Sequence, residues 1–147
     1  MRRRGVTLLG DGPHLLTQAD ELSQALELHP DFNCLLLQAH GPAAGGCARE
    51  CWRSLCESGA LTERLFAMSL CNGFDPSLAA EILEDSAATS MVVVPVEGLS
   101  VRSTGPFFVK FFVELHLHCP QSINAMMARF AFAKAQKFAP GQVQIRL

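Results

Sequence analysis

Short apolar runs alternate with amphipathic stretches along the chain, and this alternation predicts an α/β fold. Apolar runs bounded by glycine, proline or polar residues are typical of buried β-strands. Such runs lie at residues 6–9, 33–41, 64–73 and 90–96. Apolar and polar residues alternate over residues 143–147, which predicts a last edge strand or, alternatively, a frayed tail.

The first predicted helix follows residues 6–9. Thr17 and Asp20 have the form of a capping box, so the helix is expected to begin at Thr17. It is expected to end before Pro30, because the residue that precedes a proline disfavours the α region. The apolar stripe that should face the core consists of Leu22, Ala25 and Leu26.

Four further helices are predicted, over residues 47–58, from Asp75, over residues 106–119 and from Ser122. Gly59 lies at the C′ position of the second helix, and Pro76 follows Asp75 in the first turn of the third. Residues 41–46 and 98–105 predict loops. The stripe expected to be buried in the last helix is Ile123, Met126, Met127 and Phe130, at i, i+3, i+4 and i+7.

The order of these elements predicts a three-layer α/β/α sandwich with a mostly parallel sheet. Residues 34–37 are almost wholly apolar, which is typical of an interior strand covered by helices on both faces. The 23 residues from Gly41 to Glu63 are long enough for the crossover that two parallel strands require.

Composition narrows the class of protein. The chain has 147 residues, which favours one domain, expected over residues 5–147. A net charge of −2 predicts no general attraction to nucleic acid or to anionic membranes. No apolar run approaches the roughly 20 residues that cross a bilayer, and the basic start is too short for a signal peptide. A soluble, cytoplasmic protein is the expectation.

Six cysteines are present, and outside a small secreted scaffold free thiols are more common than disulfides. Cys47, Cys51 and Cys56 fall on one predicted helix, where we expect packed side chains rather than a zinc site. Residues 10–13 lack the patterns of phosphate-binding loops. The sequence therefore predicts no metal site and no cofactor.

Two predicted strands end in reactive side chains, His40 and Cys71. If the strands are parallel neighbours, both residues lie at the carboxyl edge of the sheet, where α/β folds place their chemistry. An imidazole beside a thiol stabilises the nucleophilic thiolate. A cysteine at the end of a buried strand is alternatively a packed apolar residue.

The order of motifs resembles the caspase–haemoglobinase clan of cysteine peptidases, and specifically its CHAT domains. The matching motifs are a strand that ends in His40-Gly41, the segment Ser69-Leu70-Cys71, an alanine-rich helix from Ser77, the Pro95-Val96-Glu97 motif, the phenylalanine-rich helix from Pro106 and a last helix from Ile123. Leu70 stands where the family favours a small residue. The resemblance covers nearly the whole chain and implies an incomplete C-terminal portion of the family domain.

The resemblance implies a caspase-like cysteine peptidase that cleaves peptide bonds, with His40 as general acid and base and Cys71 as nucleophile. It also implies the Gly41 amide as an oxyanion donor and Glu97 as a contact for a basic substrate residue. A catalytically inactive caspase-like interaction module is the alternative. In both cases the expected partner is a protein or peptide, with the domain in a longer helical-repeat protein. A third hypothesis, a flavodoxin-like or nucleotide-binding domain, lacks its phosphate loop.

Overall fold

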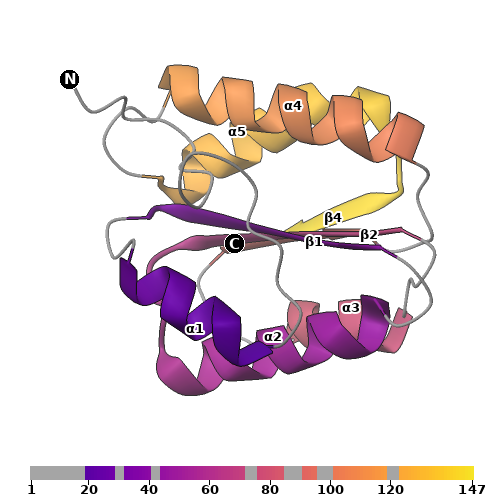
Figure 1. Ribbon diagram of the computed structural model, residues 1–147. Helices are drawn as coiled ribbons and strands as arrows, with labels where there is room; N and C mark the ends of the chain where they lie inside the picture. Colours follow the sequence, from indigo (N-terminus) through magenta and orange to yellow (C-terminus); the bar gives the residue numbers. More distant parts are fainter. Residues whose placement is uncertain are drawn as a thin grey trace.

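A four-stranded, mostly parallel sheet organises the fold (Figure 1). The computed structural model describes residues 19–28, 32–40, 44–71, 76–84, 91–95, 101–118 and 123–147. The strands are β1 (Cys34–His40), β2 (Leu65–Cys71), β3 (Met91–Pro95) and β4 (Val143–Arg146), in the order β1-β2-β3-β4. The first three are parallel, and β4 is antiparallel to β3. The α/β class is confirmed, while the predicted strand at residues 6–9 lies outside the described residues.

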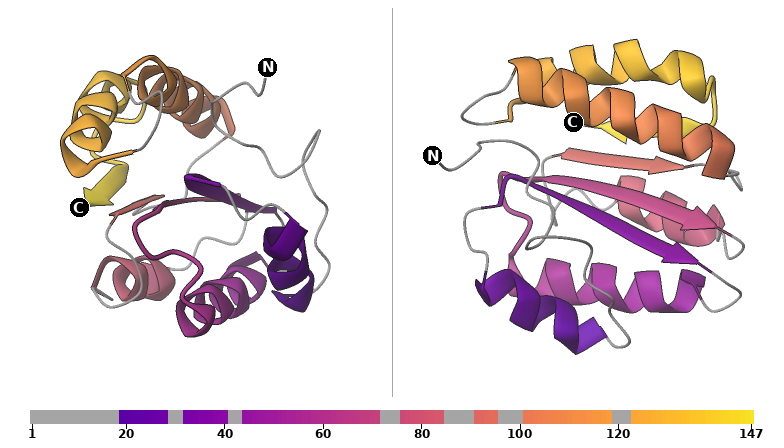
Figure 2. Two further views of the ribbon diagram at one scale, coloured as in Figure 1. Left: turned by 90° about the vertical axis from the view of Figure 1, so that its left-hand side faces the viewer. Right: turned by 45° about the horizontal axis from the view of Figure 1, so that its top comes forward.

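Helices cover both faces of this sheet (Figures 1 and 2). One face carries α1 (Ala19–Leu28), α2 (Ala44–Ser58) and α3 (Pro76–Glu84). The other carries α4 (Val101–His118) and α5 (Ala125–Ala135), and a short 3-10 helix, η1 (Gln136–Phe138), follows α5.

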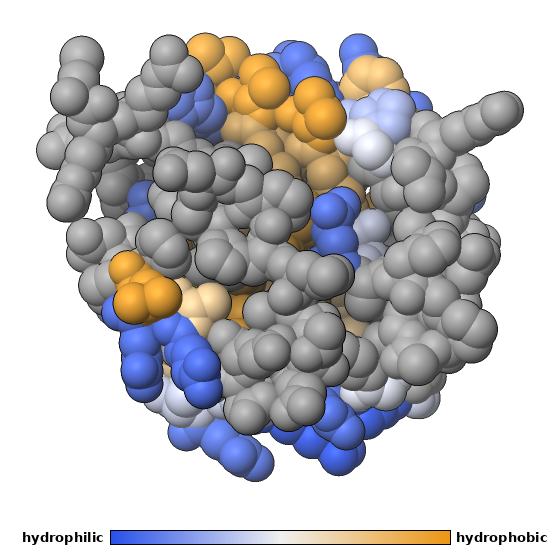
Figure 3. All heavy atoms as spheres, viewed as in Figure 1, coloured by the Kyte–Doolittle hydropathy of each residue, from blue (hydrophilic) through white to orange (hydrophobic). Residues whose placement is uncertain are grey.

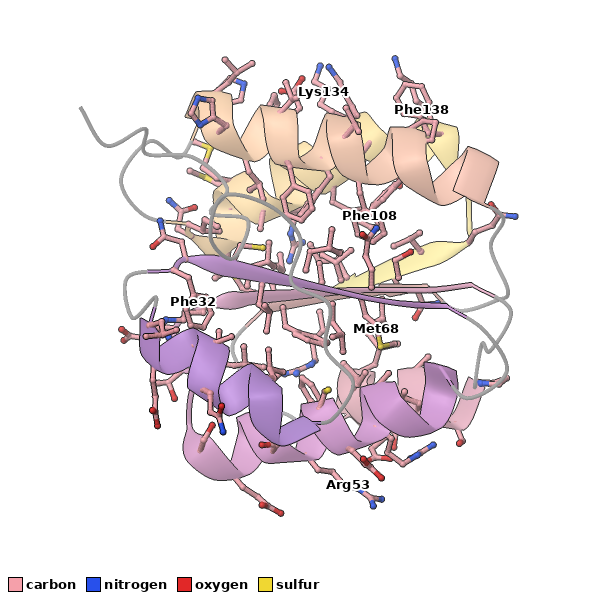
Figure 4. All side chains as sticks on the ribbon, viewed as in Figure 1. Phe32, Arg53, Met68, Phe108, Lys134 and Phe138 are labelled. Carbon is pink, nitrogen blue, oxygen red and sulfur yellow. The ribbon has the colours of Figure 1, made fainter. Side chains whose placement is uncertain are left out.

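The period-two alternation of the strands divides the apolar core between these two faces. In β2, Phe66 and Met68 belong to the cluster under α1–α3, whereas Leu65 and Ala67 belong to the cluster under α4 and α5. Figure 4 shows Met68 and Phe108 on opposite sides of the sheet. Because both faces of β2 are buried, a continuous apolar run is the pattern that this strand needs.

Two helices begin earlier than the sequence predicts. Residues 44–46 belong to α2 rather than to the predicted loop, because the buried side chains of Ala48, Cys51 and Trp52 stabilise the helix beyond the local cost of two glycines. Likewise, α4 begins at Val101, so residues 101–105 are helical and not a loop. Pro106 lies inside this helix. Its fixed φ is compatible with the α region, so the helix continues through it, although its missing N–H removes one hydrogen bond near the amino end.

The predicted buried stripe of the last helix is wrong at two of its four positions. Met126 is 69% exposed and Phe130 is 42% exposed, whereas Ile123 and Met127 are half-buried. The buried residues of α5 are instead Ala128, Ala131 and Ala135. Small side chains on that face allow α5 to pack closely, and Phe132 is half-buried against the same core cluster. The helix is capped by Asn124, whose side-chain oxygen accepts a hydrogen bond from the Met127 N–H at 2.9 Å, and not by the predicted Ser122.

Substitution of leucine for Ala131 tests the alanine face. Ala131 is 1% exposed, so a larger side chain should overpack the layer and lower the free energy of unfolding by about 1–3 kcal/mol in chemical denaturation. Ala133→Leu, at an exposed position of the same helix, is the matched control and should change stability by less than about 0.5 kcal/mol. Equal effects of the two variants would contradict the observed orientation of α5.

A charged cluster lies on α4. The carboxylate of Glu114 accepts contacts from Lys110 Nζ at 2.5 Å and from His118 Nε2 at 3.2 Å. The hydrogen bond from Lys110 lowers the pKa of Glu114 below its ordinary value, and the charges of Lys110 and His118 act in the same direction.

A lowered carboxylate pKa predicts a definite pH dependence. The stabilisation by ionised Glu114 is present above the pKa of the unfolded chain and is lost as the pH falls through the lower, folded-state pKa. Glu114→Gln should therefore lower Tm at pH 7. The difference should begin to shrink as the pH falls to about 4, near the ordinary carboxylate pKa, and should vanish below the folded-state pKa of Glu114. Glu57→Gln, which removes an exposed carboxylate on α2, should leave Tm nearly unchanged over the same pH range. A Tm difference for Glu114→Gln that does not shrink as the pH is lowered from about 5 would refute a role for its charge.

Candidate active site

The parallel pair β1 and β2 positions the two predicted catalytic residues. Seven residue pairs connect the strands, from Cys34 opposite Leu65 to His40 opposite Cys71. Both residues are the last of their strands. The backbone register thus places His40 and Cys71 side by side at the carboxyl edge of the sheet.

Contacts at the opposite end of the two strands fix this register. The α2–β2 connection begins at Gly59, which adopts a φ of 68° and donates its N–H to the Cys56 carbonyl at 3.2 Å. The Leu65 N–H then donates to the Asn33 carbonyl at 3.0 Å. The guanidinium carbon of Arg64 lies 4.0 Å from the centroid of the Phe32 ring. The Leu65–Asn33 hydrogen bond and the Arg64–Phe32 contact thus join the residues just before β1 to the start of β2.

The described pairing with β3 reaches less far along β2. Paired positions between β2 and β3 run from Leu65–Met91 to Ala67–Val93. In the described pairs, therefore, the carboxyl half of β2 is held by β1.

Strand alternation assigns both positions to one face of the sheet. In β1, positions 35 and 37 face α1–α3, so positions 36, 38 and 40 lie on the other face of the sheet. In β2, positions 66 and 68 face α1–α3, so positions 67, 69 and 71 lie on that same other face. Adjacent strands are about 4.8 Å apart, so opposite residues on one face of the sheet have neighbouring Cβ atoms. Positions 40 and 71 therefore belong to the set of strand positions on the face covered by α4 and α5, and the register makes them direct neighbours there.

The side chains of His40 and Cys71 lie outside the described residues, as do Gly41 and Glu97 altogether. For the dyad, the structure thus establishes the backbone positions. The roles of Gly41 as oxyanion donor and of Glu97 as substrate contact remain predictions from the sequence.

The other described cysteines are placed unfavourably for nucleophilic chemistry. Cys34 is 4% exposed, and burial raises the pKa of its thiol far above the ordinary value. Cys51 is 1% exposed, and Cys56 is half-buried on the same helix. Cys34 and Cys51 are thus packed core residues. The packing predicted for the cysteines of α2 is confirmed for Cys51, while Cys56 is partly buried against the core and the side chain of Cys47 lies outside the described residues.

Over the described ranges, no group of three or more histidine, cysteine, aspartate or glutamate side chains is arranged to hold a metal ion. None of the helices in the part of the chain that the structure describes is both long and apolar enough to cross a bilayer.

Two further residues lie beside the pair: Ser69, named above only as part of the Ser69-Leu70-Cys71 segment, and Gln38, which the sequence analysis did not name. Ser69 is only 3% exposed and stands two positions before Cys71, opposite the exposed Gln38 of β1. A small polar residue inside an otherwise apolar strand, at even spacing from the cysteine, is the signal that marks this position.

Comparisons with models of protein families, with curated proteins and with solved structures gave no match. We therefore infer function from the register of β1 and β2 and from the residue types at their carboxyl ends.

A paired-thiol variant tests the register directly. In His40→Cys, the new thiol stands opposite Cys71, so phenylarsine oxide, which binds two adjacent thiols together, should bridge residues 40 and 71. Gln38→Cys, two positions earlier on the same face, is the matched control and should not form this bridge. Peptide mapping by mass spectrometry identifies the linked cysteines. Bridging of residues 38 and 71 in preference to 40 and 71 would show a different register.

Proposed function

We propose that this chain is a caspase-like cysteine peptidase domain that cleaves peptide bonds through a dyad of His40 and Cys71. The observation that carries the proposal is the register pair of His40 and Cys71 at the carboxyl end of two parallel strands. The resemblance to CHAT domains implies this arrangement, with the histidine and the cysteine on successive strands. The proposal includes the finer fold, a three-layer caspase-like α/β/α sandwich.

The proposed reaction begins with proton transfer from the Cys71 thiol to the imidazole of His40. The thiolate then attacks the carbonyl carbon of the scissile peptide bond, and the carbonyl electron pair moves to oxygen. The Gly41 amide donates a hydrogen bond to this oxyanion, because glycine allows a close approach of the backbone. Glu97 contacts a basic residue of the substrate.

Collapse of the tetrahedral intermediate breaks the carbon–nitrogen bond. The protonated His40 donates its proton to the departing amine, and an acyl group remains on the sulfur of Cys71. His40 then removes a proton from water, which attacks the thioester and releases the carboxylic acid product. The second half-reaction regenerates the thiol and the neutral imidazole, so no further reactant is required.

The second candidate is a catalytically inactive caspase-like module that acts through protein contacts. Two observations favour it: Leu70 occupies the position before Cys71 where the related family favours a small residue, and α4 and α5 expose large apolar side chains. This candidate shares the fold and dispenses with hydrolysis.

Selective labelling tests the dyad. A peptidyl electrophile should modify Cys71 ahead of the other five cysteines at neutral pH, because an adjacent imidazole raises the thiolate fraction. His40→Ala should reduce the labelling rate of Cys71 by roughly two orders of magnitude, in the range of a general base contribution. Gln38→Ala, a neighbouring exposed position on β1, is the control and should label like the wild type. Site-specific rates come from mass spectrometry of tryptic peptides.

Labelling spread evenly over the cysteines, or concentrated on Cys47, would contradict the dyad. Cleavage of a fluorogenic peptide library then distinguishes the two candidates. Hydrolysis that Cys71→Ala abolishes supports the peptidase, whereas selective labelling of Cys71 without hydrolysis supports the inactive module.

A further inference from the structure

The outer side of α4 and α5 exposes large apolar side chains in two rows. On α4, Val109, Val113 and Leu117 follow one another at i, i+4 and i+8, with exposed fractions of 66%, 47% and 64%. On α5 and η1, the exposed residues are Met126, Phe130 and Phe138. We call these six residues the α4–α5 outer surface. Figure 3 shows apolar side chains gathered along the outer side of α4, at the top of the view.

These two rows belong to one continuous layer. The helices α4 and α5 pack against each other, and the His118 ring lies 5.1 Å from the Phe130 ring in an edge-on arrangement. His118 belongs to the charged row of Lys110 and Glu114, which lies beside the apolar row on α4, so the layer combines apolar and charged side chains. The orientation of α5 is the reverse of that expected for a helix whose outer face meets only water, because alanine is buried while methionine and phenylalanine are exposed.

Positive charges lie directly beside the exposed rings. Lys134 Nζ is 5.4 Å from the centroid of Phe130, and Lys137 Nζ is 5.2 Å from the centroid of Phe138. Arg129 is a third exposed cation on α5. Figure 4 shows Lys134 and Phe138 on the outer side of the layer, away from the sheet.

Negative charge is almost absent from the last third of the chain, which includes α4 and α5. Residues 101–147 include six lysine or arginine residues and one acidic residue, Glu114, which contacts Lys110 and His118. Residues 1–100 include six lysine or arginine residues and 13 acidic ones. Described acidic side chains such as Glu50, Glu57 and Glu84 are exposed on α2 and α3, the helices of the opposite face.

We propose that the α4–α5 outer surface docks an acidic amphipathic helix of a partner protein. Apolar residues of that helix at i, i+3 or i+4, and i+7 would cover the rows on α4 and α5, and its flanking carboxylates would meet Lys134 and Lys137. The proposal holds whether or not the Cys71–His40 pair is catalytic.

A two-fold symmetric pair of this chain on the same surface is disfavoured, since it would bring like charges together. A membrane surface is the rival occupant, because phenylalanine and leucine beside lysine also bind interfaces, although tryptophan and tyrosine are the commonest anchors there. The chain has no tyrosine, and its single tryptophan, Trp52, is 1% exposed in the opposite layer. The ion-paired ridge of Lys110 and Glu114 also lies on α4 beside the exposed row.

The test uses a labelled helical peptide of about 18 residues, with leucine along one face and glutamate beside it. The full chain should bind it with micromolar affinity in fluorescence anisotropy. A peptide of identical composition whose leucines are spread around the helix should bind at least about tenfold more weakly. Backbone amide shifts in NMR spectra should change on α4 and α5, and not on α1–α3.

Surface variants give the matched comparison. Leu117→Gln and the double variant Lys134→Glu/Lys137→Glu should each weaken binding about tenfold or more, with unchanged thermal unfolding because these side chains are exposed. A lysine-rich version of the peptide should bind the double variant better than the wild type. Leu28→Gln, at a position 77% exposed on α1, is the control and should bind like the wild type.

Three results would overturn the proposal. The first is equal affinity for the ordered and the scrambled peptide. The second is binding to phosphatidylserine vesicles with no binding of the peptide, which would assign the surface to membranes. The third is self-association in sedimentation velocity that Leu117→Gln abolishes, which would assign the surface to a second copy.

Discussion

The pairing of β1 with β2 is the interaction on which the remainder of the structure depends. Seven consecutive residue pairs hold the strands parallel, and the described pairing with β3 covers a shorter part of β2. A slip of one residue would move Phe66 and Met68 from one helical layer to the other, and all the apolar side chains of the strand with them. Burial of both faces of β2 thus specifies the register strongly, and the same register brings His40 and Cys71 together.

The two helical layers cover the sheet with side chains of different sizes. Beneath the sheet, large side chains such as Trp52 and Phe66 interlock, with ring centroids 5.0 Å apart, and Arg49 joins α2 to α3 through Glu81. Above it, the phenylalanines of α4 fill the space over the sheet, and α5 packs through alanine. Larger apolar residues of α5 are thereby left on the outside, beside lysines. The chain consequently has an anionic helical layer and a cationic, partly apolar one, and the candidate docking surface lies on the second layer.

The sequence pattern predicts those strands and helix ends that are determined by the residue types of the segment itself. The uninterrupted apolar runs that end at His40 and Cys71 marked both strands, and the intervening helix implied their parallel pairing. Gly59 marked the end of α2, since its φ of 68° suits glycine. Patterns failed where tertiary packing decides. Pro106 is typical of a helix boundary, yet it lies within α4, and hydrophobicity ranks Met126 and Phe130 above the alanines that are buried. Gly41 and Glu97 lie outside the described residues, and the periodicity of the sequence does not encode their positions.

The central claim is that His40 and Cys71 are register partners, and backbone nuclear Overhauser effects measure this most directly. Parallel strands bring backbone protons of facing residues close together, because the chains are about 4.8 Å apart. In a spectrum of the native, isotope-labelled protein, cross-strand contacts should connect residues 39 and 40 with residues 70 and 71. Contacts that instead connect His40 with Ser69 or earlier residues, or an absence of contacts between these two strands, would contradict the account.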